Sequence, residues 1–221
     1  MSASYTKQRI IEYVMKTTEA SSLNDVHVSK LIQTLGINRN TFYYHFDSKH
    51  DVAMYVFRVD LAKQLRTCVQ PEHLLETPVS KKRKAESLPF YMHYEIGARL
   101  LDHSAFLKSL VRCVMDRPLF YRKIFNPSVS EIRTGFFNLY RNAIEDDIRF
   151  TLGERYMPEE TFDFLLHMHL NTIYETPLYH LANTQASDKL LDDSNNPFWN
   201  YPYETLAAEI QNHSIMRPRH R

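Results

Sequence analysis

Apolar residues recur at every third or fourth position along most of the chain, which is the spacing of one face of an α-helix. The segments 28–35, 158–184 and 203–214 show this pattern most clearly. Strands that alternate apolar and polar residues are hard to find. The chain also has only four glycines, fewer than turn-rich β folds usually need. The pattern therefore predicts an all-α fold.

The periodicity also predicts the order of the helices. We expect helices over residues 5–20, 28–35 and 39–46, a fourth from Ser48 to about 66, and five more over 87–103, 105–116, 128–152, 158–184 and 203–214. Pro177 should kink or end the helix that contains it. Two polar segments, 71–89 and 185–202, are expected to be connectors, and the basic run over 81–84 is interpreted as a solvated part of the first.

The segment 28–46 has the signals of a helix-turn-helix. Gly36 follows the last apolar residue of the first helix, where a helix end favours a left-handed backbone. Asn38 then provides an N-cap for the next helix, in which Phe42 and Phe46 share one face. The remaining faces carry polar and aromatic side chains. A helix of this kind fits the major groove of DNA, where base edges present a readable hydrogen-bonding pattern.

Charge divides the chain only mildly. The 27 Lys and Arg residues nearly balance the 26 Asp and Glu residues, which excludes a generally basic coat for nucleic acid. Residues 1–66 hold nine basic and six acidic residues, a net charge of +3, so residues 67–221 hold 18 and 20, a net charge of −2. Between Asp25 and Asp47 there is no acidic residue. The charge difference gives weak support to an anion-binding N-terminal part. Together with the helix-turn-helix, it predicts a DNA-binding domain over 1–66 and a larger helical domain over 67–221.

Motifs for other kinds of protein are missing. The sequence contains no GxGxxG, GxxxxGK[ST], HExxH, GxSxG or CxxC motif, and its two cysteines are too few for a disulfide scaffold. We therefore expect no enzyme, no catalytic residue, no cofactor and no metal site. No apolar run is long enough to cross a bilayer, and no secretory signal is seen, so a cytoplasmic protein without membrane contact is expected.

The segment 35–49, which reads LGINRNTFYYHFDSK, resembles the TetR family of transcriptional regulators. Thr41, Tyr43, His45, Phe46 and Lys49 are in register with that family's motif, and the similarity covers about 60 N-terminal residues. The C-terminal 150 residues or so are similar only in length and helical character. The resemblance implies a three-helix DNA-binding domain joined to a larger helical effector and dimerisation domain.

The resemblance also implies which residues contact DNA. Arg39, Asn40 and Tyr43 would approach base edges, and Arg and Asn side chains are independently suited to guanine and adenine. Phosphate contacts would come from Thr41, Tyr44, His45 and Lys49, with a backbone contact from Ser29.

The family's dimer interface falls on the last two predicted helices. Their apolar stripes are Leu166, Leu170, Ile173, Leu206 and Ile210, for which an intrachain core is the alternative. The aromatic segment 90–152 would enclose an effector pocket, although aromatic residues at helical spacing are also typical of a core.

The expected function is a homodimeric transcriptional repressor that binds palindromic operator DNA and is released by a small-molecule effector. The alternative is a helical protein-interaction adaptor with a degenerate helix-turn-helix. The polar residues on the second helix favour the regulator.

Overall fold

The computed structural model describes residues 3–79, 86–126, 128–193 and 196–216, so the basic run over 81–84 lies outside the described residues. The structure is mostly helical, in agreement with the predicted class. The helices are α1 (Ala3–Ala20), α2 (Val28–Leu35), α3 (Arg39–His45), α4 (Lys49–Cys68), α5 (Ser104–Met115), α6 (Pro118–Ile124), α7 (Ser130–Leu152), α8 (Glu159–Ala182), α9 (Thr184–Asp192) and α10 (Tyr201–His213), with short 3₁₀ helices at Pro71–His73 and Pro197–Trp199.

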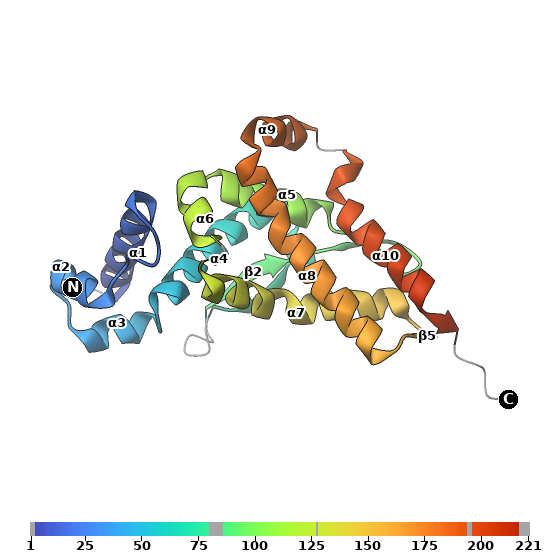
Figure 1. Cartoon of the computed structure of the whole chain (residues 1–221), viewed down its shortest axis with the longest axis horizontal. Coiled ribbons are helices and arrows are strands. Elements are labelled where there is room, and N and C mark those ends of the chain that lie inside the picture. The colour runs from blue at the N-terminus through green and yellow to red at the C-terminus, as the bar shows by residue number, and fades with distance from the viewer. Residues whose placement is uncertain (1–2, 80–85, 127, 194–195, 217–221) are drawn as a thin grey trace.

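The three N-terminal helices form a small unit at one end of the molecule, and α4 leads from it into a larger helical body (Figure 1). Helix α4 packs against α1 on one side and against α5, α7 and strand β2 (Ser87–Tyr91) on the other. Helix α1 also contacts α6. In the body, α8 packs on both α5 and α7, and α10 packs beside α7 and α8.

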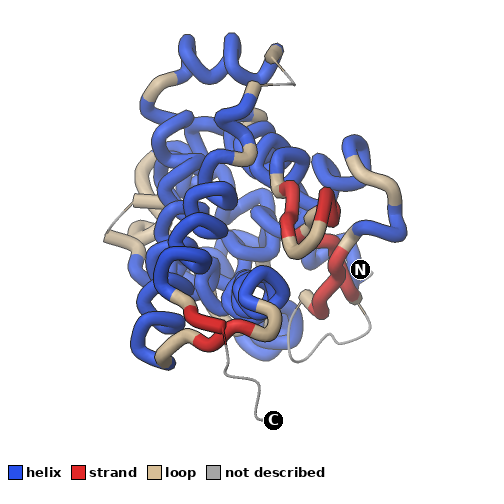
Figure 2. Tube along the Cα trace, turned by 90° about the vertical axis from the view of Figure 1, so that its right-hand side faces the viewer, coloured by secondary structure: helices blue, strands red, loops and turns tan. Residues whose placement is uncertain are grey.

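Short antiparallel two-stranded sheets accompany the helices (Figure 2). In the described residues, β1 (Leu75–Pro78) pairs with β2, β3 (Tyr94–Gly97) with β4 (Leu100–Asp102), and β5 (Arg155–Tyr156) with β6 (Ile215–Met216). The predicted helix over 87–103 is therefore wrong, because this segment forms three strands. The expected 71–89 connector likewise contains strand β1 and the first residues of β2.

A buried arginine holds the first hairpin against α4. Arg58, 5% exposed, donates hydrogen bonds to the carbonyl oxygens of Pro78 (2.6 Å), Thr77 (2.7 Å) and Leu88 (3.3 Å). The main chain of the hairpin thus supplies acceptors to both terminal nitrogens of the buried guanidinium, while its Nε has no hydrogen-bond partner among the described residues. This long-range contact gives a physical reason for the β1–β2 pair, which local periodicity did not predict.

The aromatic residues of 90–152 form much of the core of the body. The rings of Tyr91 and Phe106 are 4.6 Å apart, those of Phe136 and Tyr140 are 4.5 Å apart, and all four side chains are fully buried. These rings pack on one another, as the core alternative for this segment expects. The effector pocket that the resemblance implies stays a prediction.

The C-terminal helices have two features to report against expectation. Of the two outcomes expected at Pro177, a helix end is wrong, because α8 continues through it, and a kink stays a prediction. Residues 185–192 belong to α9 instead of a connector. Beyond it, the fully buried ring of Trp199 stacks on His180 with centroids 5.8 Å apart and an interplanar angle of 14°, which joins the second 3₁₀ helix to α8.

Candidate functional site

The link between α2 and α3 is defined by local hydrogen bonds. Gly36 ends α2 with φ of 63°, the left-handed conformation that glycine adopts without steric cost. Asn38 begins α3, and its Oδ1 accepts hydrogen bonds from the Thr41 backbone N–H at 2.7 Å and the Thr41 hydroxyl at 2.9 Å. The predicted turn and cap are both present, and together they fix the direction in which α3 leaves α2.

One face of α3 is fixed by the core. Phe42 is fully buried, Phe46 is 1% exposed, and Leu31 of α2 is fully buried beside them in the same apolar cluster. The Phe46 ring also lies 5.7 Å from the ring of Tyr55 on α4. The helix cannot rotate about its axis without exposing these rings, so its opposite face is held in a defined orientation.

Five of the eight predicted DNA-contacting residues are exposed together on α2 and α3. They are Ser29, Arg39, Asn40, Tyr43 and Tyr44. The Tyr44 side chain is 72% exposed, and the Arg39 guanidinium carbon lies 5.5 Å from the centroid of the Tyr43 ring. A cation and an aromatic ring at this distance attract each other, which restrains both side chains on the exposed face.

The other three predicted residues are placed differently. The Thr41 hydroxyl is used in the helix cap, and Lys49 Nζ donates to the Asn24 carbonyl oxygen at 2.8 Å. His45 is only 6% exposed, so its ring faces the protein instead of the surface expected for a phosphate contact. Burial follows from its position at the end of α3, beside Phe46.

Sequence reasoning missed three further polar residues of α2. Lys30, Gln33 and Thr34 are exposed on the same helix as Ser29. The signal was available, because residues three and four apart lie on one helix face. The exposed polar surface is thus broader than α3 alone, and it carries two cationic side chains, Lys30 and Arg39.

The five residues expected at a dimer interface are buried within one chain. Leu166, Leu170, Ile173, Leu206 and Ile210 are between 0% and 5% exposed. They form part of the subunit core, because α8 and α10 pack on each other and on α7. A second chain could not contact them without opening that core.

A different apolar face of α8 and α10 is accessible. Phe164, Met168 and Tyr201 are 61%, 48% and 63% exposed and border a hollow of about 400 Å³ between the two helices. Phe164 and Met168 are one helical turn apart, so they project from the same side of α8. Large apolar side chains grouped in this way are typical of a protein-interaction surface.

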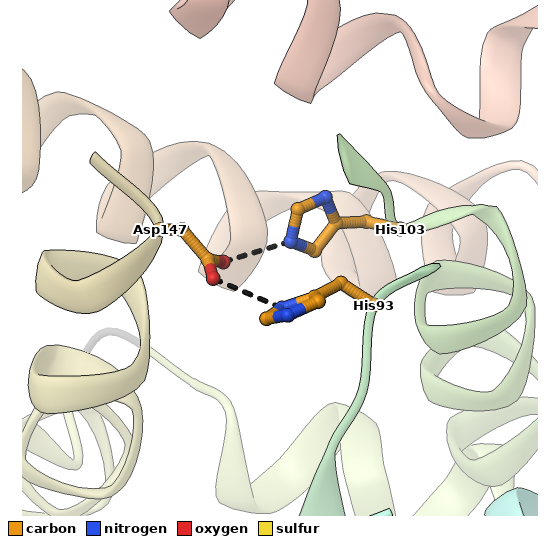
Figure 3. Close-up of side chains that lie close together, drawn as sticks. All are labelled: His93, His103 and Asp147. Atoms are coloured by element: carbon orange, nitrogen blue, oxygen red, sulfur yellow. Dashed lines mark hydrogen bonds and ion pairs between the residues drawn. The ribbon is translucent and has the colours of Figure 1, made fainter. Parts of the chain in front are cut away.

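A cluster of two histidines and one aspartate lies inside the body (Figure 3). His93 follows β2, His103 precedes α5, and Asp147 belongs to α7. Nε2 of His103 is 2.8 Å from Asp147 Oδ2, and Nδ1 of His93 is 2.9 Å from Asp147 Oδ1. The aspartate is 2% exposed, and the side chains of His103 and His93 are 3% and 28% exposed. One carboxylate therefore joins two separate segments to α7.

The charge of the cluster is set by competing effects. Burial alone would raise the pKa of Asp147, but the contacts with His103 and His93 outweigh it and lower this pKa to about 2. The contact with Asp147 raises the pKa of His93, which burial partly opposes. Tyr91 also donates to Asp147 Oδ2 at 2.6 Å. Asp147 is accordingly an anion that accepts a hydrogen bond from Tyr91 and lies within 2.9 Å of a nitrogen of each histidine.

A third histidine nearby is held neutral, and this predicts a dependence of stability on pH. Burial lowers the pKa of His169 to about 3, with His103 adding to the effect and Asp147 opposing it. Between about pH 6 and pH 4 the unfolded chain binds a proton at this residue and the folded chain does not. As the pH is lowered through this range, His169 should therefore reduce the free energy of unfolding by up to about 1.4 kcal/mol per pH unit.

Urea unfolding of His169→Gln between pH 7 and pH 4 checks this expectation. In the variant, the free energy of unfolding should depend less steeply on pH than in the native chain, by the contribution of about one proton. His213→Gln serves as the control, because His213 is exposed beside Glu209. An unchanged slope in His169→Gln would mean that His169 titrates normally in the folded protein.

The cluster was not predicted from the sequence. Its members are separated by 10 and 44 positions and match no short ligand motif. His93 and His103 lie in loops that adjoin strands, in a segment that the periodicity assigned to a helix. The missing information was the pairing of β3 with β4, which brings residue 94 opposite residue 102 and so places the two histidines beside each other.

Comparison with known proteins adds no family assignment: no family model matches the chain, and no curated protein matches its sequence. The TetR resemblance is therefore carried by the motif over 35–49. Within the part of the chain that the structure describes, no helix combines the length and apolar character needed to cross a membrane.

Proposed function

We propose that this protein is a sequence-specific DNA-binding transcriptional regulator that acts as a homodimer on palindromic operator DNA. The observation that carries the proposal is the exposed face of α3, where Arg39, Asn40, Tyr43 and Tyr44 lie opposite the buried Phe42. Direct reading of bases requires a helix with free hydrogen-bonding groups on a rigid support. The cap at Asn38 and the aromatic core provide that support.

Charge near α3 is consistent with contact to the DNA backbone. Lys30 and Arg39 are exposed cations, and the nearest acidic residues along the chain are Asp25 and Asp47. Phosphate contacts position a protein on DNA, and base contacts then select the sequence. The exposed groups of α2 and α3 offer both kinds of contact.

A homodimer would present two copies of α3. The accessible face with Phe164, Met168 and Tyr201 is the surface that a second chain would cover in this proposal. Two recognition helices reach successive major grooves when their separation is about 34–36 Å, one turn of DNA. The bound sequence should then be a palindrome with half-sites at that spacing.

Regulation requires a path from the body to α3, and α4 is the direct covalent connection. We propose repression that an effector relieves, as the TetR resemblance implies. An effector changes DNA affinity only by the difference in its own affinity for the two states. The relevant effector site must therefore contact elements that also contact α1 or α4.

Selection of bound sequences from a random DNA pool tests the proposed function. We expect an enriched palindrome with the native protein. Arg39→Ala should cost roughly 1–3 kcal/mol in affinity and relax the preference at one base position in each half-site. The reason is that Arg39 is the exposed group best able to make a bidentate contact with guanine.

Arg141→Ala is the matched control, because Arg141 is exposed on α7 away from α3. It should leave the enriched sequence unchanged. If the native protein enriches no sequence, the regulator is the wrong class. The adaptor alternative, which the apolar face of α8 and α10 would serve, then becomes the better explanation.

A further inference from the structure

We propose that His93, His103 and Asp147 bind one divalent transition-metal ion of the Zn²⁺ class, and that this ion is the effector. The first half stands on the geometry of the cluster alone. The second half rests on the proposed function.

The ligand set suits such an ion. Two imidazole nitrogens and one carboxylate oxygen are the donors found in three-ligand zinc sites, which leave a further position for water. The donor atoms of the three residues all lie within 4.8 Å of one another. Ions of this class bind nitrogen and oxygen at about 2.0–2.2 Å, so modest side-chain movement would bring all three donors to one centre.

The surroundings both position the ligands and leave a way in. The Tyr91 hydroxyl donates to Asp147 Oδ2 and so can keep the carboxylate oriented while the other oxygen binds the ion. His93 is the most exposed of the three side chains and gives access from solvent. Nδ1 of His103 is buried without a hydrogen-bond partner, so its imidazole lacks the second-shell support that tightens permanent metal sites. An exchangeable ion fits this arrangement better than a structural one.

Strand β2 connects the cluster to helices α1 and α4. Just before the strand, the Glu86 carboxylate accepts hydrogen bonds from Lys7 of α1 at 3.1 Å and from Tyr55 of α4 at 2.9 Å. Arg58 of α4 holds the Leu88 carbonyl in the middle of the strand. Tyr91, its last residue, and His93, two residues further on, both contact Asp147. An ion that draws these residues together would act on a strand attached to both α1 and α4.

Titration of the metal-free full-length protein with Zn²⁺ and Co²⁺ tests the site. Calorimetry should give one tight Zn²⁺ ion per chain, and bound Co²⁺ should show the intense visible absorption of a four- or five-coordinate site. His93→Gln should lower the affinity at least 10-fold. His213→Gln, which alters an exposed histidine–glutamate pair 3.0 Å apart, should bind as the native chain does.

Two results would overturn the site. One is the absence of Zn²⁺ and Co²⁺ binding by a folded native chain. The other is equal binding by native protein and His93→Gln, which would assign the ion to other histidines. Circular dichroism should first show that His93→Gln retains native helix content. If it does not, His103→Gln replaces it and is judged by the same two results.

Binding of the selected operator, with and without saturating Zn²⁺, tests the effector role. We expect at least a 10-fold change in DNA affinity in the native protein and none in His93→Gln. Zn²⁺ binding with unchanged DNA affinity would overturn the effector role and leave the site standing. Failure to bind any DNA sequence would instead overturn the proposed function, and the calorimetric result would remain valid.

Discussion

Replacing Arg58 with methionine is expected to lower the free energy of unfolding by about 3–5 kcal/mol. The guanidinium is the common donor to three backbone carbonyls, those of Thr77, Pro78 and Leu88. Methionine fills similar space but leaves those oxygens without their donor. Urea unfolding followed by circular dichroism measures the loss.

Arg66→Met is the matched control on the same helix. The Arg66 side chain is 53% exposed and lies 3.9 Å from Glu76, an exposed pair that contributes little to stability. Its substitution should change the free energy of unfolding by less than about 1 kcal/mol. Equal effects of the two substitutions would show that the buried hydrogen bonds of Arg58 are not a main support of the hairpin.

Glutamate at position 170 is expected to unfold the chain, whereas glutamate at position 168 is expected to separate a dimer without unfolding it. Leu170 is fully buried, so Leu170→Glu places an unpaired charge in the core at a cost of about 4–5 kcal/mol or more. Met168 is 48% exposed on the same helix, and its substitution costs the single chain little. Light scattering gives the mass, and circular dichroism gives the helix content.

Leu119→Glu is the control for the second substitution. Leu119 is 64% exposed on α6. The substitution therefore adds the same charge at an exposed apolar position away from α8 and α10. It should leave the mass of a dimer unchanged. A Met168→Glu protein that remains dimeric would place the interface on another surface, and a folded Leu170→Glu protein would contradict the assignment of Leu170 to the core.

Local sequence signals predicted the helices whose own residues include an N-cap, a C-terminal signal and a regular apolar spacing. Helix α2 has the predicted bounds, and Gly36 and Asn38 have the predicted roles. These features depend on residues within one or two turns of each other. Strand β2 depends instead on pairing with β1 and on Arg58, and β3 pairs with β4 across a short turn, and a helical reading of the apolar pattern contains neither.

Exposure was harder to predict than helix position. His45 and the apolar stripes of α8 and α10 have the expected spacing, yet neighbouring elements cover them. A helical wheel shows which residues share a face, but only the packing of other elements decides whether that face meets solvent. The His93–His103–Asp147 cluster was beyond such reasoning, because three elements bring it together.

The stacking of Trp199 on His180 makes the protein's own fluorescence selective. Trp199 is the single tryptophan of the chain, and it lies at the C-terminal end of the body, joined to α8. Its emission therefore reports the environment of that end and carries no signal from α1–α3. Cys68 is exposed at the end of α4 and Cys113 is buried, so a thiol dye would attach to α4 alone. The Cys68 sulfur lies 3.4 Å from Nη1 of Arg112 on α5, so the two optical signals report two separate places in the helical body, one beside α8 and one where α4 meets α5.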